Sequence, residues 1–463
     1  MKILLVKLNQ EADEIIPPIG LGYLANAVRK NHSVRVLDCL KEKISLAKLL
    51  DFLQEKKPGL VGILFFTMNY YQVKETAFAI RKRFPSMKII VGGPHPSALP
   101  KETLKEIPEI DFAFAGEAEI GFPMLADALE KKNPSSSSLE KIPSLVWRKK
   151  NGVIVNPNKV VENLDELGFP AWDLLKPETY PMAPHGSFFR QFPVAPIIIT
   201  RGCPYSCTFC GGHLVSGKRI RSRSLESVMQ EIRLLVKEHG IREIHIEDDN
   251  FTFKRKFVED FCNALLKEKL GITWACPNGM RLDTLDRELI FLMKKSGLHT
   301  VSVGIESGSE RILKLVKKSL NKKQIREKVE LIDSAGLNVI GFFMLGFPTE
   351  TRKEIEETID FACSLPLKRI AFSCMQPFPG TEVYNSLLES GEIEKVNWET
   401  CFLFKATYSP KGLSIEELQK LRKQGLRKFY FRPKIIFSML GEINSPKQVF
   451  FVAKRAVHWL FRT

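Results

Sequence analysis

Three cysteines lie close together near the middle of the chain, at Cys203, Cys207 and Cys210. Their spacing is Cys-x3-Cys-x2-Cys, which places three thiols on one short loop. Three thiolates so placed can ligate three irons of a [4Fe–4S] cluster, and the fourth iron then stays open to a substrate or cofactor. His213 follows the loop, so a tetrahedral Cys3His zinc site is the alternative that these residues leave open.

The elements around this loop favour the cluster. From residue 196 on, short apolar runs alternate with helical patterns, as in a series of βα units. Six such units predict a partial barrel, whose functional residues should directly follow the strands. The cysteine loop follows the first strand, and a structural zinc ribbon needs no such barrel. The predicted strands are Pro196–Thr200, Glu243–Glu247, Ile272–Cys276, Thr300–Gly304, Asn338–Met344 and Arg369–Ser373.

An earlier part of the chain, before residue 130, also alternates apolar strands with helices. This pattern predicts a doubly wound parallel sheet covered on both faces, with its ligand at the carboxyl ends of the strands. Those ends are rich in glycine, which lets the backbone approach a large ligand. No Gly-x-Gly-x-x-Gly or P-loop motif follows the first strand, which argues against a dinucleotide or P-loop site. The residues expected at this edge include Gly20, Gly92, Gly93, Gly116 and Glu117.

Between Pro196 and about Tyr384, the sequence resembles the radical S-adenosylmethionine (SAM) superfamily. The resemblance implies that the three cysteines hold a [4Fe–4S] cluster whose open iron chelates the amino and carboxylate groups of SAM. One electron then releases methionine and a 5′-deoxyadenosyl radical. The positions that the resemblance assigns to SAM are Phe209 and Gly346 near the adenine, Glu247 and Asp248 at the amino group, Arg281 at the carboxylate, and Ser302 and Glu306 at the ribose.

Each of these residues has a structural alternative when it is taken alone. Glu247, Asp248 and Asp249 also suit a helix N-terminus, where the dipole favours acids. Arg281 also suits an ion pair within the protein, and Gly346 also suits a plain loop. The matching segments stand in the right order at successive strand ends, and this order favours the SAM site.

The amino-terminal sheet resembles the cobalamin-binding domain that precedes many radical SAM barrels. The resemblance rests on residues 17–25, 36–38, 91–96 and 116–119. It implies a corrin that lies over the strand ends, close to Thr67, Met68, Asn69 and His95. A loop histidine that caps a backbone carbonyl is the alternative for His95. A sheet that binds a nucleotide, or no ligand, is the alternative for the domain.

One departure from related domains is informative. Methionine-synthase-like domains carry an Asp-x-His-x-x-Gly motif after the first strand, and its histidine ligates cobalt. Residues 9–18 of this chain contain no histidine. The resemblance therefore implies that cobalamin binds base-off, without a histidine ligand from the protein.

The composition restricts the class of protein. The chain has 463 residues, of which 44% are hydrophobic and 26% charged, so it is not mostly disordered. Nine cysteines are an odd number, and three of them are clustered, which does not suit a secreted disulfide framework. The apolar run at residues 1–7 is too short for a signal peptide, and no transmembrane run occurs. We expect a cytoplasmic protein, with peripheral contact at the inner face of the membrane.

Most of the net charge of +16 lies at the carboxyl end. Residues 418–463 contain 11 Lys and Arg and the single acid Glu442, which gives +10. No RNA-binding module appears, so nucleic acid is not an expected partner. The cations and aromatics of residues 449–461 are typical of an interfacial helix on an anionic membrane. The alternative is a helix whose apolar face packs on the barrel while its cations stay in water.

The sequence thus predicts four segments. They are a cobalamin-binding domain at 1–133, a linker with a hairpin at Asn151-Gly152 over 134–195, a partial (β/α)6 barrel at 196–400 and a basic helical region at 401–463. Cys374, after the sixth strand, is expected in the core, and a place at the mouth of the barrel is the alternative.

The expected function is modification of an unactivated carbon of a lipophilic small molecule, with an electron donor such as flavodoxin or ferredoxin. Methyl transfer is favoured because many members of the resembled subfamily are methylases. Oxidative cyclisation, as in anaerobic magnesium-protoporphyrin ester cyclases, is the alternative reaction. A membrane-tethered cobalamin and iron–sulfur sensor is the alternative without catalysis.

Overall fold

A computed structural model describes residues 1–9, 15–131, 134–182, 189–394, 396, 398 and 404–441. The predicted tail helix at 449–461 lies outside these residues. The chain divides into two compact units. The first contains Met1–Tyr205, Cys210–Phe251 and Asn263–Asn278, and the second contains Ser206–Phe209, Thr252–Cys262 and the residues from Gly279 on.

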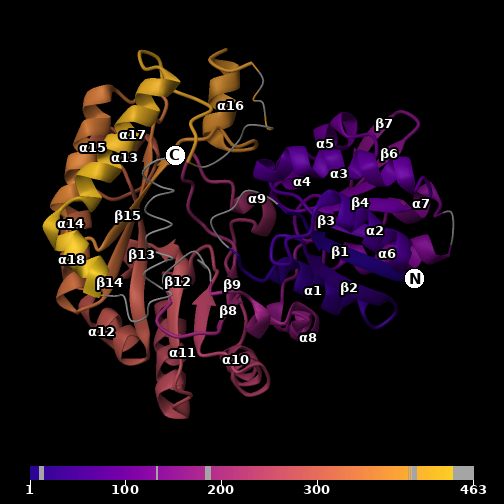
Figure 1. The fold of residues 1–463 in the computed structure, drawn as a ribbon, viewed down its shortest axis with the longest axis horizontal. Coiled ribbons are helices and arrows are strands. Elements are labelled where there is room, and N and C mark those ends of the chain that lie inside the picture. Colours follow the sequence, from indigo (N-terminus) through magenta and orange to yellow (C-terminus); the bar gives the residue numbers. More distant parts are fainter. Residues whose placement is uncertain are drawn as a thin grey trace. The chain divides into compact units, whose positions relative to one another are not determined.

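The first unit contains a seven-stranded sheet in the order β2-β1-β3-β4-β5-β6-β7 (Figure 1). The five strands β1 to β5 are parallel, as the sequence predicted. Their bounds are β1 Lys2–Lys7, β2 Ser33–Asp38, β3 Leu60–Leu64, β4 Lys88–Gly92 and β5 Phe112–Phe114. The helices between and after them are α1 Ile19–Val28, α2 Leu46–Lys56, α3 Tyr70–Arg83, α4 Pro94–Ala98, α5 Pro100–Glu106 and α6 Gly121–Glu130.

Apolar side chains of β1, α1 and α6 form one core of this unit. Leu5 of β1, Leu21 and Ala25 of α1, and Phe122 and Leu125 of α6 are buried in the same cluster. Every residue of β1 after Lys2 is buried, because helices cover the sheet on both sides. A strand of this kind reads as a continuous apolar run, which is why its position was predictable.

The hairpin at Asn151-Gly152 forms as predicted, but it belongs to the first sheet and not to a separate linker. Strand β6 (Leu145–Lys149) pairs antiparallel with β5, and β7 (Gly152–Val155) pairs with β6. The amino-terminal sheet therefore extends to Val155. Short helices occupy much of the remaining predicted linker: α7 Ser136–Leu139, η2 Leu164–Leu167, α8 Trp172–Leu175 and η3 Pro177–Thr179.

A second, parallel sheet of six strands contains all six strands predicted from residue 196 on. In the first unit, β11 pairs in parallel with β8 and with β12. Two very short strands, β9 and β10, pair antiparallel before and after the cysteine loop, and the sequence did not indicate them. The elements are β8 Val194–Ile197, β9 Thr200–Arg201, α9 His213–Ser216, β10 Arg221–Ser222, α10 Leu225–His239, β11 Glu243–Ile246 and β12 Thr273–Met280.

In the second unit, β13, β14 and β15 pair in parallel. The elements that lie wholly in this unit are η5 Leu282–Thr284, α12 Arg287–Lys295, β13 Leu298–Glu306, α13 Glu310–Leu315, α14 Lys322–Ser334, β14 Asn338–Leu345, α15 Arg352–Ser364, β15 Arg369–Cys374, α16 Glu382–Glu389, α17 Ile415–Tyr430 and α18 Pro433–Gly441. Residues of η4 Phe251–Phe253 and of α11 Arg255–Glu268 are divided between the two units. Capping boxes begin two of these helices, Thr351 with Glu354 at α15 and Ser414 with Glu417 at α17. Cys374 is buried, as expected.

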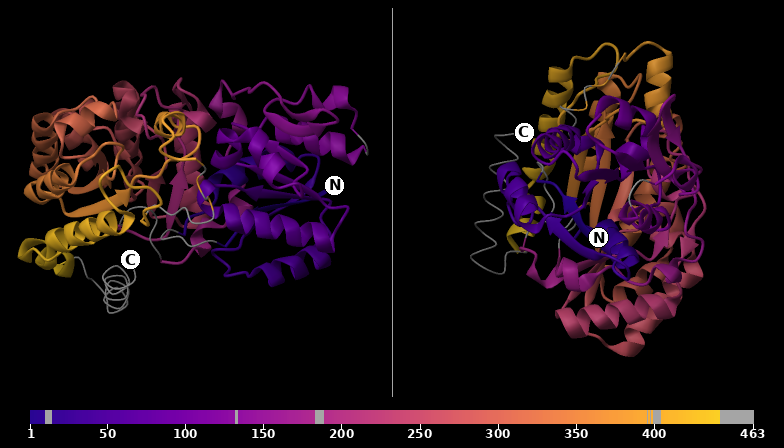
Figure 2. Two further views of the ribbon diagram at one scale, coloured as in Figure 1. Left: turned by 90° about the horizontal axis from the view of Figure 1, so that it is seen from above. Right: turned by 90° about the vertical axis from the view of Figure 1, so that its right-hand side faces the viewer.

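Helix α17 belongs to the core of the second unit. It lies against strand β15 and helix α15. Figure 2 shows its yellow ribbon beside the orange elements of the same unit. Leu418, Leu421, Leu426 and Phe429 are buried on its inner face. Helix α17 is therefore packed within its unit, whereas the two alternatives for the tail helix at 449–461 concern residues outside the described ones.

Candidate functional site

The cysteine loop is closed at its base by backbone contacts. Strands β9 and β10 pair with Arg201 opposite Arg221, and the Cys203 N–H donates to the Gly217 carbonyl at 3.2 Å. Gly202 has a φ of +92°, and a Cβ there would lie 2.4 Å from the Arg219 carbonyl oxygen. Only glycine fits at this position, directly before the first cysteine.

The thiols of this loop have the chemistry that a [4Fe–4S] cluster requires. Cys203 and Cys207 are half-buried and Cys210 is exposed, and the Gly212 N–H faces the Cys210 sulfur at 3.5 Å. A backbone N–H aimed at sulfur favours the thiolate. Within the described part of the chain, no three His, Cys, Asp or Glu side chains are arranged to hold a metal ion. The support for a [4Fe–4S] cluster at this loop is therefore the presence of three thiols on one loop.

Two acidic residues after β11 hold the chain as it enters the cysteine loop. Asp248 Oδ1 accepts from the Ile199 N–H at 2.7 Å, and Oδ2 accepts from the N–H and the hydroxyl of Thr200, both at 2.8 Å. Asp249 accepts from the Gly202 N–H. Burial raises the pKa of Asp248 to about 7. Because both oxygens of Asp248 already bind the protein, its observed role is to position the loop, which differs from the predicted contact with SAM.

The same segment also holds a buried amide. Asn250 is 1% exposed, and neither its Oδ1 nor its Nδ2 has a hydrogen-bond partner in the structure. Buried polar atoms of this kind are rare unless a ligand or water satisfies them. The neighbouring Glu247 is half-buried, and its carbonyl accepts from Asn278 at 2.8 Å. Asn250 was not predicted as a site residue, because a sequence does not show which amides lack partners.

The end of β13 carries the two residues that were assigned to the ribose. The Ser302 hydroxyl is buried and has no partner, so it can accept a ligand group. Glu306 is also buried, with a φ of +70°, but its Oε1 accepts from Lys318 Nζ at 2.8 Å. The structure thus places Glu306 in a buried ion pair that the sequence did not indicate. Ser302 fits the predicted role more directly than Glu306.

Arg281 likewise has partners within the protein. Its Nε and Nη2 donate to the two oxygens of Asp283 at 2.9 and 2.7 Å, and Nη2 also donates to the Lys318 carbonyl at 3.1 Å. The structure thus contains the ion pair that was the structural alternative for Arg281, and its pairing with the methionine carboxylate stays a prediction.

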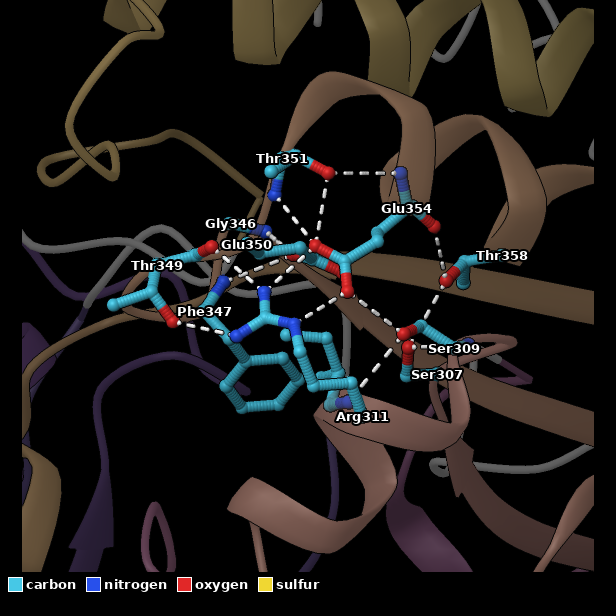
Figure 3. A network of polar contacts seen from close by, with 11 residues as sticks. Ser307, Ser309, Arg311, Gly346, Phe347, Thr349, Glu350, Thr351, Glu354 and Thr358 are labelled. Carbon is cyan, nitrogen blue, oxygen red and sulfur yellow. Dashed lines mark hydrogen bonds and ion pairs between the residues drawn. The ribbon is translucent and has the colours of Figure 1, made fainter.

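The loop after β14 is fixed by a buried carboxyl group. Glu350 Oε2 accepts from the N–H groups of Gly346 and Phe347, at 2.6 and 3.0 Å (Figure 3). Glu350 is 1% exposed and its Oε1 has no partner, so burial raises its pKa to about 8. The Phe347 ring contacts the ring of Phe209, with centroids 5.6 Å apart. Two positions predicted near the adenine, Gly346 and Phe209, are thus linked through Phe347.

An exposed arginine supports the same loop from outside. Arg311 donates to both oxygens of Glu354 at 2.8 and 2.7 Å, and to the carbonyl of Thr349 at 2.8 Å (Figure 3). This pairing lowers the pKa of Glu354 to about 2. Glu350 is therefore neutral and Glu354 ionised at neutral pH, although the two lie only four residues apart.

In the amino-terminal sheet, the polar residues predicted near the corrin follow β3 and β4 and have hydrogen-bond partners within the protein. His95 is 1% exposed, its Nδ1 lies 3.1 Å from the Thr67 hydroxyl, and its ring stacks on Phe65 at 4.3 Å. Burial lowers the pKa of His95 to about 4, so the imidazole is neutral. Asn69 accepts from the Phe66 N–H and donates to the Leu64 carbonyl, which caps the short helix η1 (Thr67–Asn69). Met68 is half-buried.

Of the four glycines at this edge, Gly93 and Gly116 are crowded by neighbouring atoms, and Gly20 and Gly92 are open. Gly93 has a φ of +121°, and a Cβ there would lie 2.9 Å from the Phe65 carbonyl oxygen. Gly20 is exposed, with open space where a Cβ would stand, and Gly92 has only a distant neighbour. Gly116 has a φ of +93° and packs on the Asn158 side chain.

Glu117 also has partners within the protein. Its carboxylate is buried, and both oxygens accept from Arg221, at 2.6 and 2.9 Å. It also lies 3.3 Å from Arg201. This carboxylate is therefore engaged with residues that flank the cysteine loop, and its contact with a corrin stays a prediction.

Comparison with known proteins agrees with both predicted domains. Residues 197–362 match the radical SAM superfamily, and residues 6–126 match the B12 binding domain. "Uncharacterized methyltransferase PH0819" of Pyrococcus horikoshii is 33% identical over 448 residues, covering 96% of this chain and 94% of that protein. The anaerobic magnesium-protoporphyrin IX monomethyl ester cyclase of Rubrivivax gelatinosus is 26% identical, over 89% of this chain and 74% of its own length. The solved radical SAM methyltransferase TsrM of Kitasatospora setae has a TM-score of 0.70 at 18% identity, covering 94% of this chain and 84% of TsrM.

Proposed function

Because the chain belongs to the radical SAM enzymes that carry a B12-binding domain, we propose that it methylates an unactivated carbon of a small molecule. Its cofactors are a [4Fe–4S] cluster, SAM and cobalamin. When they are bound, the cluster supplies the electron that cleaves SAM, and cobalamin supplies a transferable methyl group. The observation that carries methylation is the match to PH0819 over nearly the full length of both chains.

In our proposal, the residues of this chain have the following roles. Cys203, Cys207 and Cys210 ligate the cluster, and Asp248 fixes the strand that leads into their loop. The unpartnered Asn250 amide and Ser302 hydroxyl each bind a polar group of SAM, which would satisfy atoms that are costly to bury alone. Glu350 shapes the loop at Gly346 for the adenine.

We also propose that cobalamin binds base-off without a protein histidine. Residues 9–18 contain no histidine. His95 is stacked on Phe65 and bound to Thr67, so its ring is occupied within the domain. His95→Gln should therefore leave the absorption spectrum of bound cobalamin unchanged, whereas loss of a cobalt ligand would shift it.

Oxidative cyclisation remains the second candidate reaction, and the match to the Rubrivivax gelatinosus cyclase over 89% of this chain favours it. The two reactions differ in their co-products. With reductant, SAM and a small-molecule extract as the substrate source, a methylase forms S-adenosylhomocysteine together with 5′-deoxyadenosine. A cyclase forms 5′-deoxyadenosine alone. Consumption of a substrate without S-adenosylhomocysteine would contradict methylation.

A lipophilic substrate reached at a membrane surface is a further part of the proposal. No helix in the described part of the chain is long and apolar enough to cross a membrane. At the start of α18 and just before it, Phe431, Ile436 and Phe437 are exposed, and Lys434 lies among them. Apolar side chains beside cations suit insertion into an anionic surface.

Liposome flotation tests this contact. With vesicles that contain phosphatidylserine, replacing Phe431, Ile436 and Phe437 by serine should reduce binding. The matched control is Phe78→Ser, at an equally exposed phenylalanine on α3. Equal flotation of the triple variant, the control and the unmodified protein would remove this support for a lipophilic substrate.

A further inference from the structure

A buried network of charges joins the loop after β5 to the strands that frame the cysteine loop. Glu117 accepts from Arg221 through both oxygens, at 2.6 and 2.9 Å, and from the Val161 N–H at 2.8 Å. Glu119 accepts from Arg201 at 2.7 Å. The four charged side chains are at most 9% exposed. We call Glu117, Glu119, Arg201 and Arg221 the charge clamp.

The clamp balances two like charges that the strand pairing forces together. Arg201 of β9 and Arg221 of β10 are directly opposite in the register. Like charges directly opposite on paired strands repel, and burial strengthens the repulsion. Glu117 lies within 3.3 Å of Arg201 and pairs with Arg221, while Glu119 pairs with Arg201. The two carboxylates make the cluster neutral and thereby permit the pairing of β9 with β10.

Residues of the charge clamp lie at both ends of the cysteine loop. Arg201 is separated from Cys203 by Gly202 alone, whose backbone cannot accept a side chain. At the other end, Arg221 Nη2 donates to the Ser216 carbonyl at 2.8 Å, beside the Gly217 carbonyl that accepts from Cys203. The position of the loop therefore depends on the two guanidinium groups.

The charge clamp also adjoins the glycine-rich edge of the first sheet, because Glu117 directly follows Gly116. The Gly116 N–H donates to the Ser97 hydroxyl of α4 at 2.8 Å, and α4 contacts α9 of the cysteine loop. The Arg201 guanidinium also stacks over the Tyr23 ring, 5.2 Å from its centroid. The segments that resemble a cobalamin site and the cysteine loop thus share one set of contacts within the first unit.

We propose that Glu117 is a positioning residue for the cluster, which acts through Arg201 and Arg221 and links the cysteine loop to the loop at 116–119 of the B12-binding domain. This inference rests on the proposed function, because the cluster that Glu117 positions is part of that function. The charge clamp itself is formed by the chain without cofactors. Its test can therefore be made without them.

Hydrogen exchange of the cofactor-free protein measures the clamp directly. In Glu117→Gln, amides of residues 203–217 should exchange at least about tenfold faster, because one carboxylate no longer balances two buried guanidinium groups. Glu119→Gln should show a smaller increase, since Glu119 contacts Arg201 alone. The matched control is Asp173→Asn, which breaks the exposed pair with Arg29 and should leave these amides unchanged.

A second variant covers the case in which Glu117→Gln fails to fold. Glu117→Gln combined with Arg221→Gln removes one charge of each sign, so no net charge is left buried. This double variant should fold and still exchange faster at 203–217. Unmodified exchange at 203–217 in either folded variant would overturn the proposal.

A spectroscopic readout links the clamp to the cluster. After anaerobic reconstitution, folded Glu117→Gln should show an altered electron paramagnetic resonance signal of the reduced cluster on addition of SAM. If the unmodified protein shows no cluster signal, the proposed function fails and the exchange result still stands. If the unmodified protein shows the signal and Glu117→Gln is identical to it, positioning of the cluster by Glu117 is refuted.

Discussion

At the scale of single residues, the protein uses carboxylates that look alike in sequence in three different ways. Glu350 is buried with one oxygen unpartnered and is neutral, Glu354 is ionised by Arg311, and Glu306 is buried against Lys318. The sequence places Glu306 and Arg281 after the correct strands. It does not show that Lys318 pairs with Glu306 or that Asp283 pairs with Arg281, because such pairing depends on the path of the loops. Site positions were therefore more predictable than site partners.

The raised pKa of Glu350 predicts a pH dependence of stability. The unfolded chain releases this proton near 4.5, and the folded chain holds it until about pH 8. The stability from this group is full below pH 4.5 and is lost as the pH rises to about 8. From pH 6 to pH 9, the free energy of unfolding should thus fall by about 3 kcal/mol relative to Glu350→Gln.

Urea unfolding at pH 6, 7.5 and 9 checks this expectation. Glu354→Gln is the matched control from the same network. In the unmodified protein, the folded pKa of Glu354 is about 2, so this carboxylate stays ionised from pH 6 to pH 9. The difference in free energy of unfolding between Glu354→Gln and the unmodified protein should therefore be constant over this range. Parallel pH curves for Glu350→Gln and the unmodified protein would show that Glu350 is ionised in the fold.

Gly202 predicts a sharp requirement at the base of the cysteine loop. Gly202→Ala should abolish stable cluster binding, because the left-handed φ costs about 1–3 kcal/mol and the new Cβ would meet the Arg219 carbonyl at 2.4 Å. Gly217 has a similar φ of +76°, but the space where a Cβ would stand is open. Gly217→Ala should therefore retain the cluster. Iron and sulfide per chain after reconstitution measure both variants. Equal iron contents would contradict the argument from close contact.

At the scale of elements, strands with long apolar runs and helices with capping boxes were predictable, since both signals are local. Strands β9 and β10 were not, because two residues each carry no periodic pattern. The hairpin turn was predictable from Asn151-Gly152, but its membership of the first sheet depends on pairing with the distant β5. The burial of α17 against β15 depends on packing between distant segments, which an amphipathic pattern does not specify, since such a helix suits a membrane and a protein core equally well.

The buried face of α17 predicts a clear effect on stability. Phe429→Ala should lower the free energy of unfolding by about 3–5 kcal/mol, because the ring is fully buried and leaves a cavity. Phe437→Ala, at a side chain that is 73% exposed, should change it by less than about 0.5 kcal/mol. Chemical denaturation of the two variants decides the point. A small effect at Phe429 would mean that α17 is not part of the core.

At the scale of the whole molecule, the two cofactor domains were predictable because each carries its own ordered set of motifs. The match to PH0819 at 33% identity covers 96% of this chain and 94% of that protein, so it includes the segments of both domains. The substrate was not predictable, since no residue motif in the sequence names it. The net charge of +16 likewise says little about the reaction, because +10 of it lies after residue 417.

The central claim is that the Cys203, Cys207 and Cys210 loop holds the cluster that cleaves SAM. Anaerobic reconstitution with iron, sulfide and hydroxocobalamin, followed by reductant and SAM, tests it through release of 5′-deoxyadenosine. We predict release by the unmodified protein, and loss of both iron and 5′-deoxyadenosine in Cys203→Ala. Cys374→Ala, at a buried cysteine outside the loop, should retain both. Absence of 5′-deoxyadenosine from the unmodified protein, or equal release by Cys203→Ala, would contradict the account.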